Sequence, residues 1–158
     1  MCPRVYQGLE WHFDIASGED GGNIYSHSLR YIDPASWPNV AISRHPSVQH
    51  KRGTIMIAGN TSSFDLHSFH FACTHLRSRR TQDCGIMVFG LSVEGHQIYA
   101  GPLGYEGHSL ESMVPMRRVT MPRDFRKLHE ATIVVMAFVQ VLDDVVLNID
   151  SVEHVNYF

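Results

Sequence analysis

The chain has 158 residues, of which 44% are hydrophobic, so we expect one domain with a full core. Its formal net charge of −3, with the 11 histidines neutral, argues against a nucleic-acid-binding surface. No apolar run approaches the roughly 20 residues that a membrane-spanning helix needs. The start of the chain lacks the apolar core of a signal peptide, so we expect a cytoplasmic protein, or a secreted one whose signal has been removed.

The first part of the chain predicts short strands separated by loops. In residues 5–15 apolar side chains alternate with polar ones, which indicates a strand or an irregular entry segment. Residues 17–23 are rich in glycine and acidic residues and indicate a loop, whose carboxylates could hold a cation. Prolines and bulky aromatics predict a structured loop over residues 25–43, and residues 54–58 predict a short strand.

The stretch from Phe64 to Leu91 is the part around which we expect the fold to be organised. Two strand-like runs, 64–75 and 84–91, flank the polar, basic residues 77–83, a pattern typical of a β-hairpin with a long loop. The second run is apolar on both faces, whereas an antiparallel strand with one wet face alternates apolar and polar residues. The second apolar face therefore needs a cover, and what covers it is the functional question.

The last part of the chain also predicts strands. Residues 98–100 and 114–121 indicate strands, and the glycine-rich residues 101–109 between them indicate a loop. Residues 131–139 form another apolar run, and residues 139–149 lead into a final strand. Because no stretch has a sustained 3.6-residue apolar period, long helices are not expected. Many short strands with Gly and Pro turns predict an all-β sandwich or barrel.

The chain has three cysteines, Cys2, Cys73 and Cys84, so at least one is free or pairs between chains. Cys73 and Cys84 lie symmetrically about the predicted hairpin loop and could face each other across adjacent strands, close enough for a disulfide. The alternative is two small buried thiols. A disulfide would indicate the secretory pathway, and free thiols would indicate a reducing compartment such as the cytoplasm.

Three motifs occur in order along the chain: Gly8-Leu-Glu-Trp11, then Phe64-Asp-Leu-His-Ser-Phe-His-Phe71 with a following strand that ends in Gly90, then Leu142-Asp-Asp-Val145. Together they resemble a family of small secreted β-sandwiches that is common in fungi and related to carbohydrate-binding modules. The resemblance covers most of the chain. It implies a single antiparallel jelly-roll β-sandwich, and it supports the Cys73–Cys84 pair, since similar fungal sequences carry cysteines at both strand positions.

The chain departs from this family in residues 86–90, Ile-Met-Val-Phe-Gly, where relatives have Thr, Ser and Asn on exposed strands. The change removes hydroxyls that suit sugars and supplies an apolar wall. Small fungal sandwiches have been recruited to natural-product pathways, and the hetero-Diels–Alderases of tropolone sesquiterpenoid assembly look similar in kind. Since a fold does not determine a function, the change favours a hydrophobic ligand.

Strand alternation predicts an apolar concave face with a few polar groups, the usual composition of a small-molecule site. We expect the substrate-binding residues to be Thr74, Met87, Phe89, Leu91, Thr132, Met136 and Phe138. The candidate catalytic donors, which would polarise a carbonyl or enolate oxygen, are His70, Tyr99, and Arg117 or Arg118. Alternatively, loops 16–53 and 101–113 or a second copy of the chain in a homodimer cover this face.

The histidines have no spacing typical of a transition-metal site, so no such metal is expected. A structural calcium ion is the one cofactor that the resemblance suggests, because modules of this kind often hold one between their first and last strands. Its candidate ligands are Asp14, Asp20 and Asp144, with Glu19 and Asp143 as further oxygen donors.

These observations favour a cofactor-free enzyme of fungal natural-product biosynthesis. It would hold a hydrophobic small molecule in one conformation and promote a cyclisation of the pericyclic, hetero-Diels–Alder type. The alternative is a non-catalytic, secreted carbohydrate-binding module, which predicts a shallow, wet groove flanked by exposed Trp or Tyr. A third alternative is a homodimer that buries the apolar sheet and binds no ligand.

Overall fold

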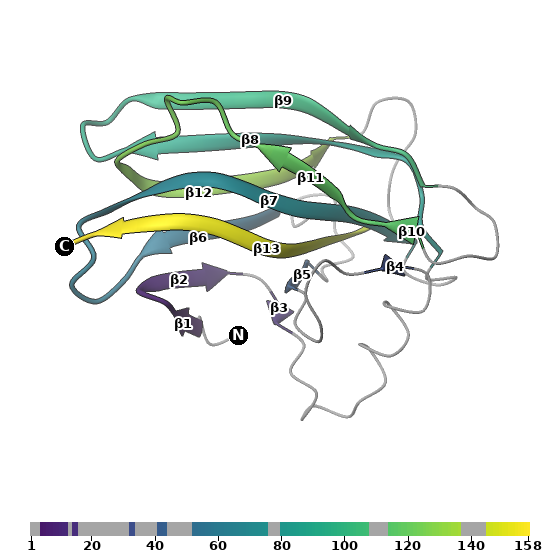
Figure 1. The fold of residues 1–158 in the computed structure, drawn as a ribbon, viewed down its shortest axis with the longest axis horizontal. Helices are drawn as coiled ribbons and strands as arrows, with labels where there is room; N and C mark the ends of the chain where they lie inside the picture. Colours follow the sequence, from purple (N-terminus) through teal and green to yellow (C-terminus); the bar gives the residue numbers. More distant parts are fainter. Residues whose placement is uncertain are drawn as a thin grey trace.

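The computed structural model describes residues 4–12, 14–15, 32–33, 41–43, 52–75, 80–107, 114–136 and 145–158. These residues form β-strands joined by turns (Figure 1). The strands are β1 (Arg4–Tyr6), β2 (Leu9–His12), β3 (Asp14–Ile15), β4 (Ile32–Asp33), β5 (Ala41–Ser43), β6 (Arg52–Ile57), β7 (Ser63–His75), β8 (Cys84–Ser92), β9 (Gln97–Tyr105), β10 (Val114–Pro115), β11 (Arg117–Thr120), β12 (Leu128–Met136) and β13 (Val145–Tyr157). No helix in the described ranges is long and apolar enough to cross a membrane.

Eleven of the strands form one sheet with antiparallel pairing throughout. Its main path runs β1-β2-β6-β12-β7-β13-β5-β3, with β8 added to β12, β9 to β8 and β11 to β7. The short strands β4 and β10 pair in parallel as a separate unit. The large sheet is open and strongly curled, like half of a barrel (Figure 1). The expected all-β, antiparallel class is therefore confirmed.

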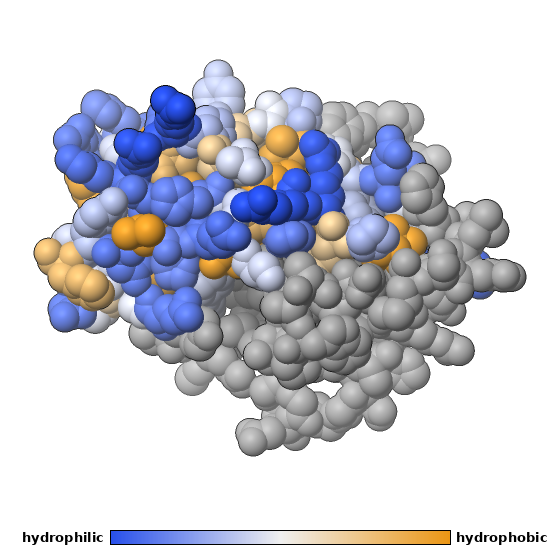
Figure 2. All heavy atoms as spheres, in the orientation of Figure 1, coloured by the Kyte–Doolittle hydropathy of each residue, from blue (hydrophilic) through white to orange (hydrophobic). Residues whose placement is uncertain are grey.

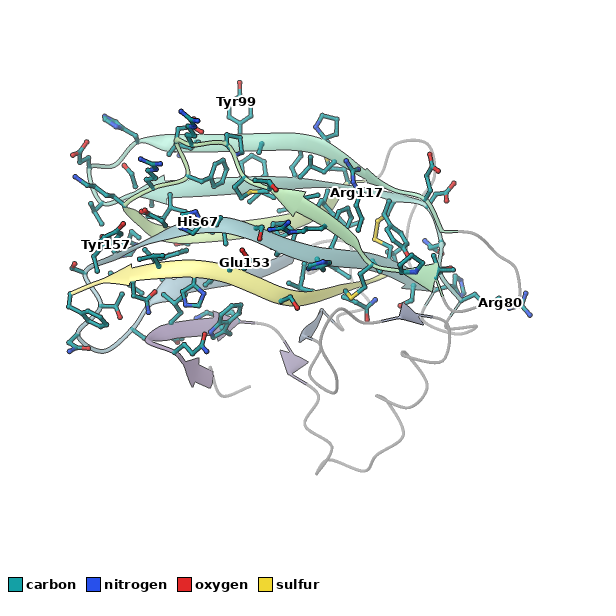
Figure 3. The ribbon with its side chains drawn as sticks, viewed as in Figure 1. His67, Arg80, Tyr99, Arg117, Glu153 and Tyr157 are labelled. Atoms are coloured by element: carbon teal, nitrogen blue, oxygen red, sulfur yellow. A yellow bond between two sulfur atoms is a disulfide. The ribbon has the colours of Figure 1, made fainter. Side chains whose placement is uncertain are left out.

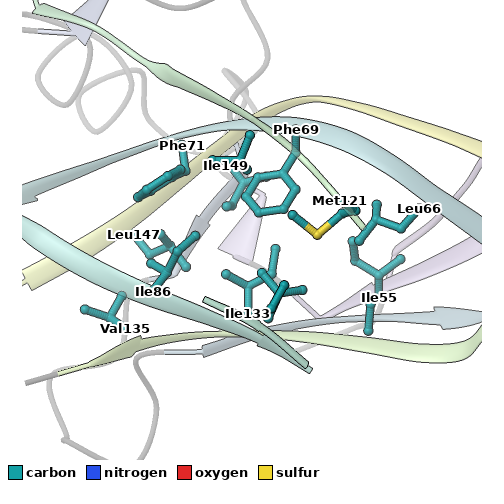
Figure 4. Packing of buried hydrophobic residues seen from close by; sticks show 14 of the residues in the cluster. Ile55, Leu66, Phe69, Phe71, Ile86, Met121, Ile133, Val135, Leu147 and Ile149 are labelled. Carbon is teal, nitrogen blue, oxygen red and sulfur yellow. The ribbon is translucent and has the colours of Figure 1, made fainter. Parts of the chain in front are cut away.

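The curled sheet has two halves. The first half contains β1, β2, β6, β12, β8 and β9, and the second half contains β11, β7, β13, β5 and β3. They are joined where Leu128 of β12 pairs with Phe64 of β7. Ile86 and Ile133 of the first half lie in one buried cluster with Phe69 and Ile149 of the second half (Figure 4). The hydrophobic core therefore lies between the inner faces of the two halves, where burial of apolar surface stabilises the curl.

Strand β7 keeps its large apolar side chains on the core side by means of a β-bulge. Leu66 and Ser68 of β7 lie opposite consecutive residues of β13, His154 and Glu153, so His67 is the extra residue. An extra residue reverses the alternation of faces. Thus Leu66 before the bulge and Phe69 after it are both buried, although their positions differ in parity. This bulge therefore lets Leu66 and Phe69 share the core-facing side of β7.

Strand β9 extends further than the sequence predicted, because it continues to Tyr105 through residues expected to be a loop. The register against β8 shifts between Ile86 and Val88, opposite the Gly101–Pro102 segment. Within the described sheet β9 pairs with β8 alone. Proline is tolerated in edge strands and at bulges because no ladder hydrogen bond needs its missing N–H.

The predicted hairpin between the two central runs is wrong, because β8 pairs with β12 and β9 rather than with β7. The chain first folds back on the end of β7, where the N–H of Gln82 donates to the carbonyl of Cys73 at 3.0 Å. It then crosses from the second half of the sheet to the first. After this crossing, apolar residues of β7 and of β8 contribute to one core from the two halves of the sheet.

A disulfide joins Cys73 of β7 to Cys84 of β8, with a Cα–Cα distance of 6.2 Å. The two cysteines do not lie on adjacent strands of a hairpin, as the sequence had suggested, but on opposite halves of the curled sheet. The disulfide therefore links the two halves directly, close to the point where the chain crosses between them.

Candidate functional site

A row of side chains, one from each of five neighbouring strands, crosses the outer face of the first half of the sheet. His12 of β2 lies opposite Thr54 of β6, and Thr54 lies opposite Thr132 of β12. Thr132 in turn lies opposite Phe89 of β8, and Phe89 lies opposite Tyr99 of β9. Residues directly opposite each other in a ladder project from the same face. We call these five residues the Phe89 row.

The aromatic end of the Phe89 row is exposed. Phe89 has a relative exposure of 46% and Tyr99 of 71%, and the Tyr99 ring projects away from the sheet (Figure 3). Ile86 and Val88, which precede Phe89 in β8, are buried on the core side. The apolar run that the sequence showed on both faces therefore serves the core with one face and an outer apolar surface with the other.

Some of the substrate-binding residues predicted from the sequence lie together on one face of the sheet, and others do not. The register puts Met87, Phe89 and Leu91 on one face of the sheet with Thr132 and Val134. Met87, Leu91, Val134 and Met136 are half-buried. Met87 and Leu91 flank Phe89 along β8, whereas Met136 lies further away, opposite Gly85. Phe138 lies outside the described residues. Thr74 lies in the second half of the sheet, where it is buried and accepts a hydrogen bond from Asn148 Nδ2 at 3.1 Å.

Polar groups gather at the other end of the Phe89 row. The hydroxyl of Thr132 donates to Oε1 of Glu130 at 3.2 Å, and Oγ1 of Thr54 lies 3.4 Å from Oγ1 of Thr132. His12 Nε2 lies 3.1 Å from Oε1 of Glu10. This surface thus combines two exposed rings with hydroxyl and carboxylate groups on the neighbouring strands.

The candidate donor His70 lies in the second half of the sheet. It is opposite Arg118 of β11, and Ser68 lies one step further along the same face of β7. Ser68 Oγ and His70 Nδ1 are buried and have no hydrogen-bond partner within the described part of the chain. Arg118 Nη2 lies 3.6 Å from Oε1 of Glu153 on β13. We call these four residues the His70 cluster, and the surface over β11, β7 and β13 is mainly hydrophilic (Figure 2).

Arg117, the other candidate donor, has a different role from its neighbour. It lies opposite Phe71 of β7, and its guanidinium donates to the backbone carbonyl of Gly104 in β9. The hydroxyl of Tyr105 donates to the carbonyl of Pro115 at 3.2 Å in the same region. Arg117 therefore connects the edge strands of the two halves, β9 and β11, and its side chain is engaged within the fold.

The structure brings one predicted catalytic residue, Tyr99, beside the predicted substrate-binding residues Phe89 and Thr132, but it places the other catalytic candidates elsewhere. His70 and Arg118 project outward from the second half of the sheet, whereas Phe89 and Tyr99 project outward from the first. Alternation within a strand shows which of its residues share a face. Residues on two different strands lie close together on that face only when the two strands are neighbours in the sheet. The sequence interpretation paired β7 with β8, whereas these strands lie in different halves of the sheet, so His70 is not next to Phe89.

The candidate calcium ligands are mostly outside the described residues. Asp14 lies in β3, whereas Asp20 and Asp144 are not described. In the described part of the chain, the structure has no group of three or more His, Cys, Asp or Glu side chains that could hold a metal ion.

Sequence reasoning missed His12 and Thr54, which complete the Phe89 row. Both alternate with buried neighbours, Trp11 and Ile55, and this alternation was visible in the sequence. The missing information was the order β2-β6-β12-β8-β9, which places the two residues in line with Phe89.

Comparisons with protein-family models, with curated proteins and with solved structures found no match. The candidate function is therefore inferred from the chemistry of the surfaces described above.

Proposed function

We propose that the protein is a carbohydrate-binding module with a jelly-roll type of β-sandwich, which binds an oligosaccharide on the outer surface formed by the Phe89 row. The observation that carries this proposal is the exposure of two neighbouring aromatic rings, Phe89 at 46% and Tyr99 at 71%, on regular strands. The packing of two sheet halves against each other is compatible with a sandwich architecture.

The composition of the surface suits a sugar. An aromatic ring held on a rigid strand offers a flat apolar surface, and a tyrosine combines it with a polar hydroxyl. A sugar presents C–H groups on one face and hydroxyls around its edge, so it needs both kinds of contact. Phe89 and Tyr99 supply the stacking surface, while Thr54 and Thr132 supply hydroxyls on the same face. Contiguous exposed apolar patches with a polar rim are typical of interaction sites.

A second candidate function is the cofactor-free cyclisation of a hydrophobic small molecule, and the His70 cluster favours it. Ser68 Oγ and His70 Nδ1 are buried with no hydrogen-bond partner among the described residues, and His70 lies opposite Arg118 in the sheet. A guanidinium and an imidazole can donate to a carbonyl or enolate oxygen as its charge develops. This candidate also needs an apolar wall beside His70, and in the described ranges the apolar set around Phe89 lies on the other half of the sheet.

Calorimetric titration with a panel of soluble oligosaccharides tests the proposed function. We expect the parent protein to bind at least one of them and Tyr99→Ala to bind about fivefold more weakly, because an aromatic contact contributes on the order of 1 kcal/mol. Phe158→Ala is the matched control, since Phe158 is an aromatic residue with 79% exposure at the end of β13, away from the Phe89 row.

Three results would overturn the carbohydrate-binding proposal. The first is that no oligosaccharide binds, and the second is that Tyr99→Ala binds as tightly as the parent. The third is that light scattering shows a dimer which Tyr99→Ala converts to a monomer, since the rings would then form a homodimer interface. Displacement of the apolar dye ANS by terpenoid or polyketide metabolites, with turnover lost in His70→Ala, would instead support the cyclase.

A further inference from the structure

The Phe89 row runs across the strands and not along them. Each of its five members lies on a different strand, in the order β2, β6, β12, β8, β9. Adjacent strands are about 4.8 Å apart, so four steps from His12 to Tyr99 span about 19 Å. The row is therefore long enough for a chain of several sugar units and is much longer than a single ring.

The hydrogen bonds within the row determine which groups it offers to a ligand. A threonine hydroxyl has one proton to donate and two lone pairs that accept. Thr132 donates its proton to Glu130 Oε1, so in its 3.4 Å contact with Thr54 the donor is the Thr54 hydroxyl. Both protons are then used inside the protein, and the two hydroxyls present only lone pairs to the solvent side. This part of the row is suited to accept hydrogen bonds from ligand hydroxyls.

The neighbouring row of the sheet adds negative charge beside these acceptors. Glu130 and Glu10 both lie opposite Met56, one on each side of it. Both side chains are half-buried, so their carboxylates are close to the surface on which a ligand would lie. An anionic ligand would be repelled by these carboxylates and could not donate hydrogen bonds to the threonine oxygens from its charged groups. An uncharged, hydroxyl-rich ligand would not be repelled and could donate hydrogen bonds to them.

We propose that the ligand is a linear, uncharged oligosaccharide that lies across the strands, with one end stacked on Tyr99 and Phe89. Its other end donates hydroxyl hydrogen bonds to Thr132 and Thr54. This inference rests on the proposed carbohydrate-binding function and extends it, because it specifies the charge, the minimum length and the direction of the ligand on the sheet. It assigns Thr54 and Thr132 as the residues that select longer ligands.

A series of linear, neutral oligosaccharides of increasing length tests the direction of binding by calorimetry. We expect the affinity to rise with length until the ligand spans the three strand steps from Tyr99 to Thr54, about 14 Å, and then to level off. In the double variant Thr54→Val, Thr132→Val, the long members should bind about fivefold more weakly per lost hydrogen bond, while the shortest member is unaffected. Tyr99→Ala should weaken every member of the series. Thr120→Val, at an exposed threonine of β11, is the matched control.

The possible outcomes separate this inference from the function on which it rests. If no saccharide of any length binds, the carbohydrate-binding function itself is wrong. If saccharides bind, but the affinity of the parent protein levels off at the shortest member, the ligand does not cross the strands and the inference is wrong. Tighter binding of acidic oligosaccharides than of neutral ones of equal length would also overturn it. That comparison uses the parent protein and so does not depend on the stability of any variant.

Discussion

Asp65 is a buried carboxylate that ties together three parts of the chain. Its Oδ1 accepts the backbone N–H of Lys127 at 2.9 Å, and its Oδ2 accepts the hydroxyl of Tyr157 at 2.8 Å. The hydrogen bond to Asp65 is the main cause that raises the pKa of Tyr157, because it favours the protonated phenol. Asp65 therefore holds the turn after β11 and the end of β13 against the start of β7.

Tyr105 provides a test of stability against pH. Burial raises the pKa of Tyr105 to about 12, because ionisation would place a charge in an apolar environment. An unfolded tyrosine titrates near 10, so this group contributes stability that is fully present below about pH 10 and is lost as the pH rises toward 12. We expect the urea midpoint of the parent to fall over this window and that of Tyr105→Phe to fall less.

Tyr157→Phe is the comparison variant, since the pKa of Tyr157 is raised in the same direction. We expect the double variant Tyr105→Phe, Tyr157→Phe to have the flattest profile of the four proteins. An identical loss of stability between about pH 10 and 12 in the parent and in the double variant would contradict this explanation.

At the scale of elements, the edge strands β9 and β11 are held together by side chains. In the described sheet β9 pairs with β8 and β11 pairs with β7, so no backbone ladder joins the two edges. Instead, Arg117 donates to the carbonyl of Gly104 and Tyr105 donates to the carbonyl of Pro115. These contacts, together with the nearby disulfide, fix how far the two halves of the curled sheet can separate at this end.

Arg117 and Arg118 form a matched pair for testing this connection. We expect Arg117→Ala to lower the free energy of unfolding by about 1–2 kcal/mol, because a charge-assisted hydrogen bond between the two halves is lost. Arg118→Ala should cost less than about 0.5 kcal/mol, because its ion pair with Glu153 is exposed. Urea denaturation measures both. Equal effects of the two substitutions would show that Arg117 does not connect the edges.

For the whole molecule, the Cys73–Cys84 disulfide is a covalent cross-link between the two halves. It closes a loop with a sequence separation of 11 residues, and a loop of this size is expected to contribute about 2–3 kcal/mol by restricting the unfolded chain. We therefore expect a reducing agent to lower the urea midpoint of the parent. The double variant Cys73→Ala, Cys84→Ala should have a low midpoint that the reducing agent does not change. A parent protein insensitive to the reducing agent, with both thiols shown to be reduced, would refute this role.

The sequence by itself determined the class of the fold and the composition of each strand face. Short apolar runs without a helical period predicted an all-β protein, and the structure confirms an antiparallel, curled sheet. Alternation also indicated that Met87, Phe89 and Leu91 share a face, which the register shows. Both properties depend on residues that are close together in the chain, since the side-chain period of a strand is local.

Only the tertiary structure decided which strands lie together and which faces are covered. It placed β7 and β8 in opposite halves, separated His70 from Phe89, and aligned His12 and Thr54 with Tyr99. It also showed that the Tyr99 ring is exposed. These properties depend on pairings between residues far apart in the chain, and they follow from the need to bury the inner faces of both halves in one core. The period of a single strand carries no information about its neighbour in the sheet.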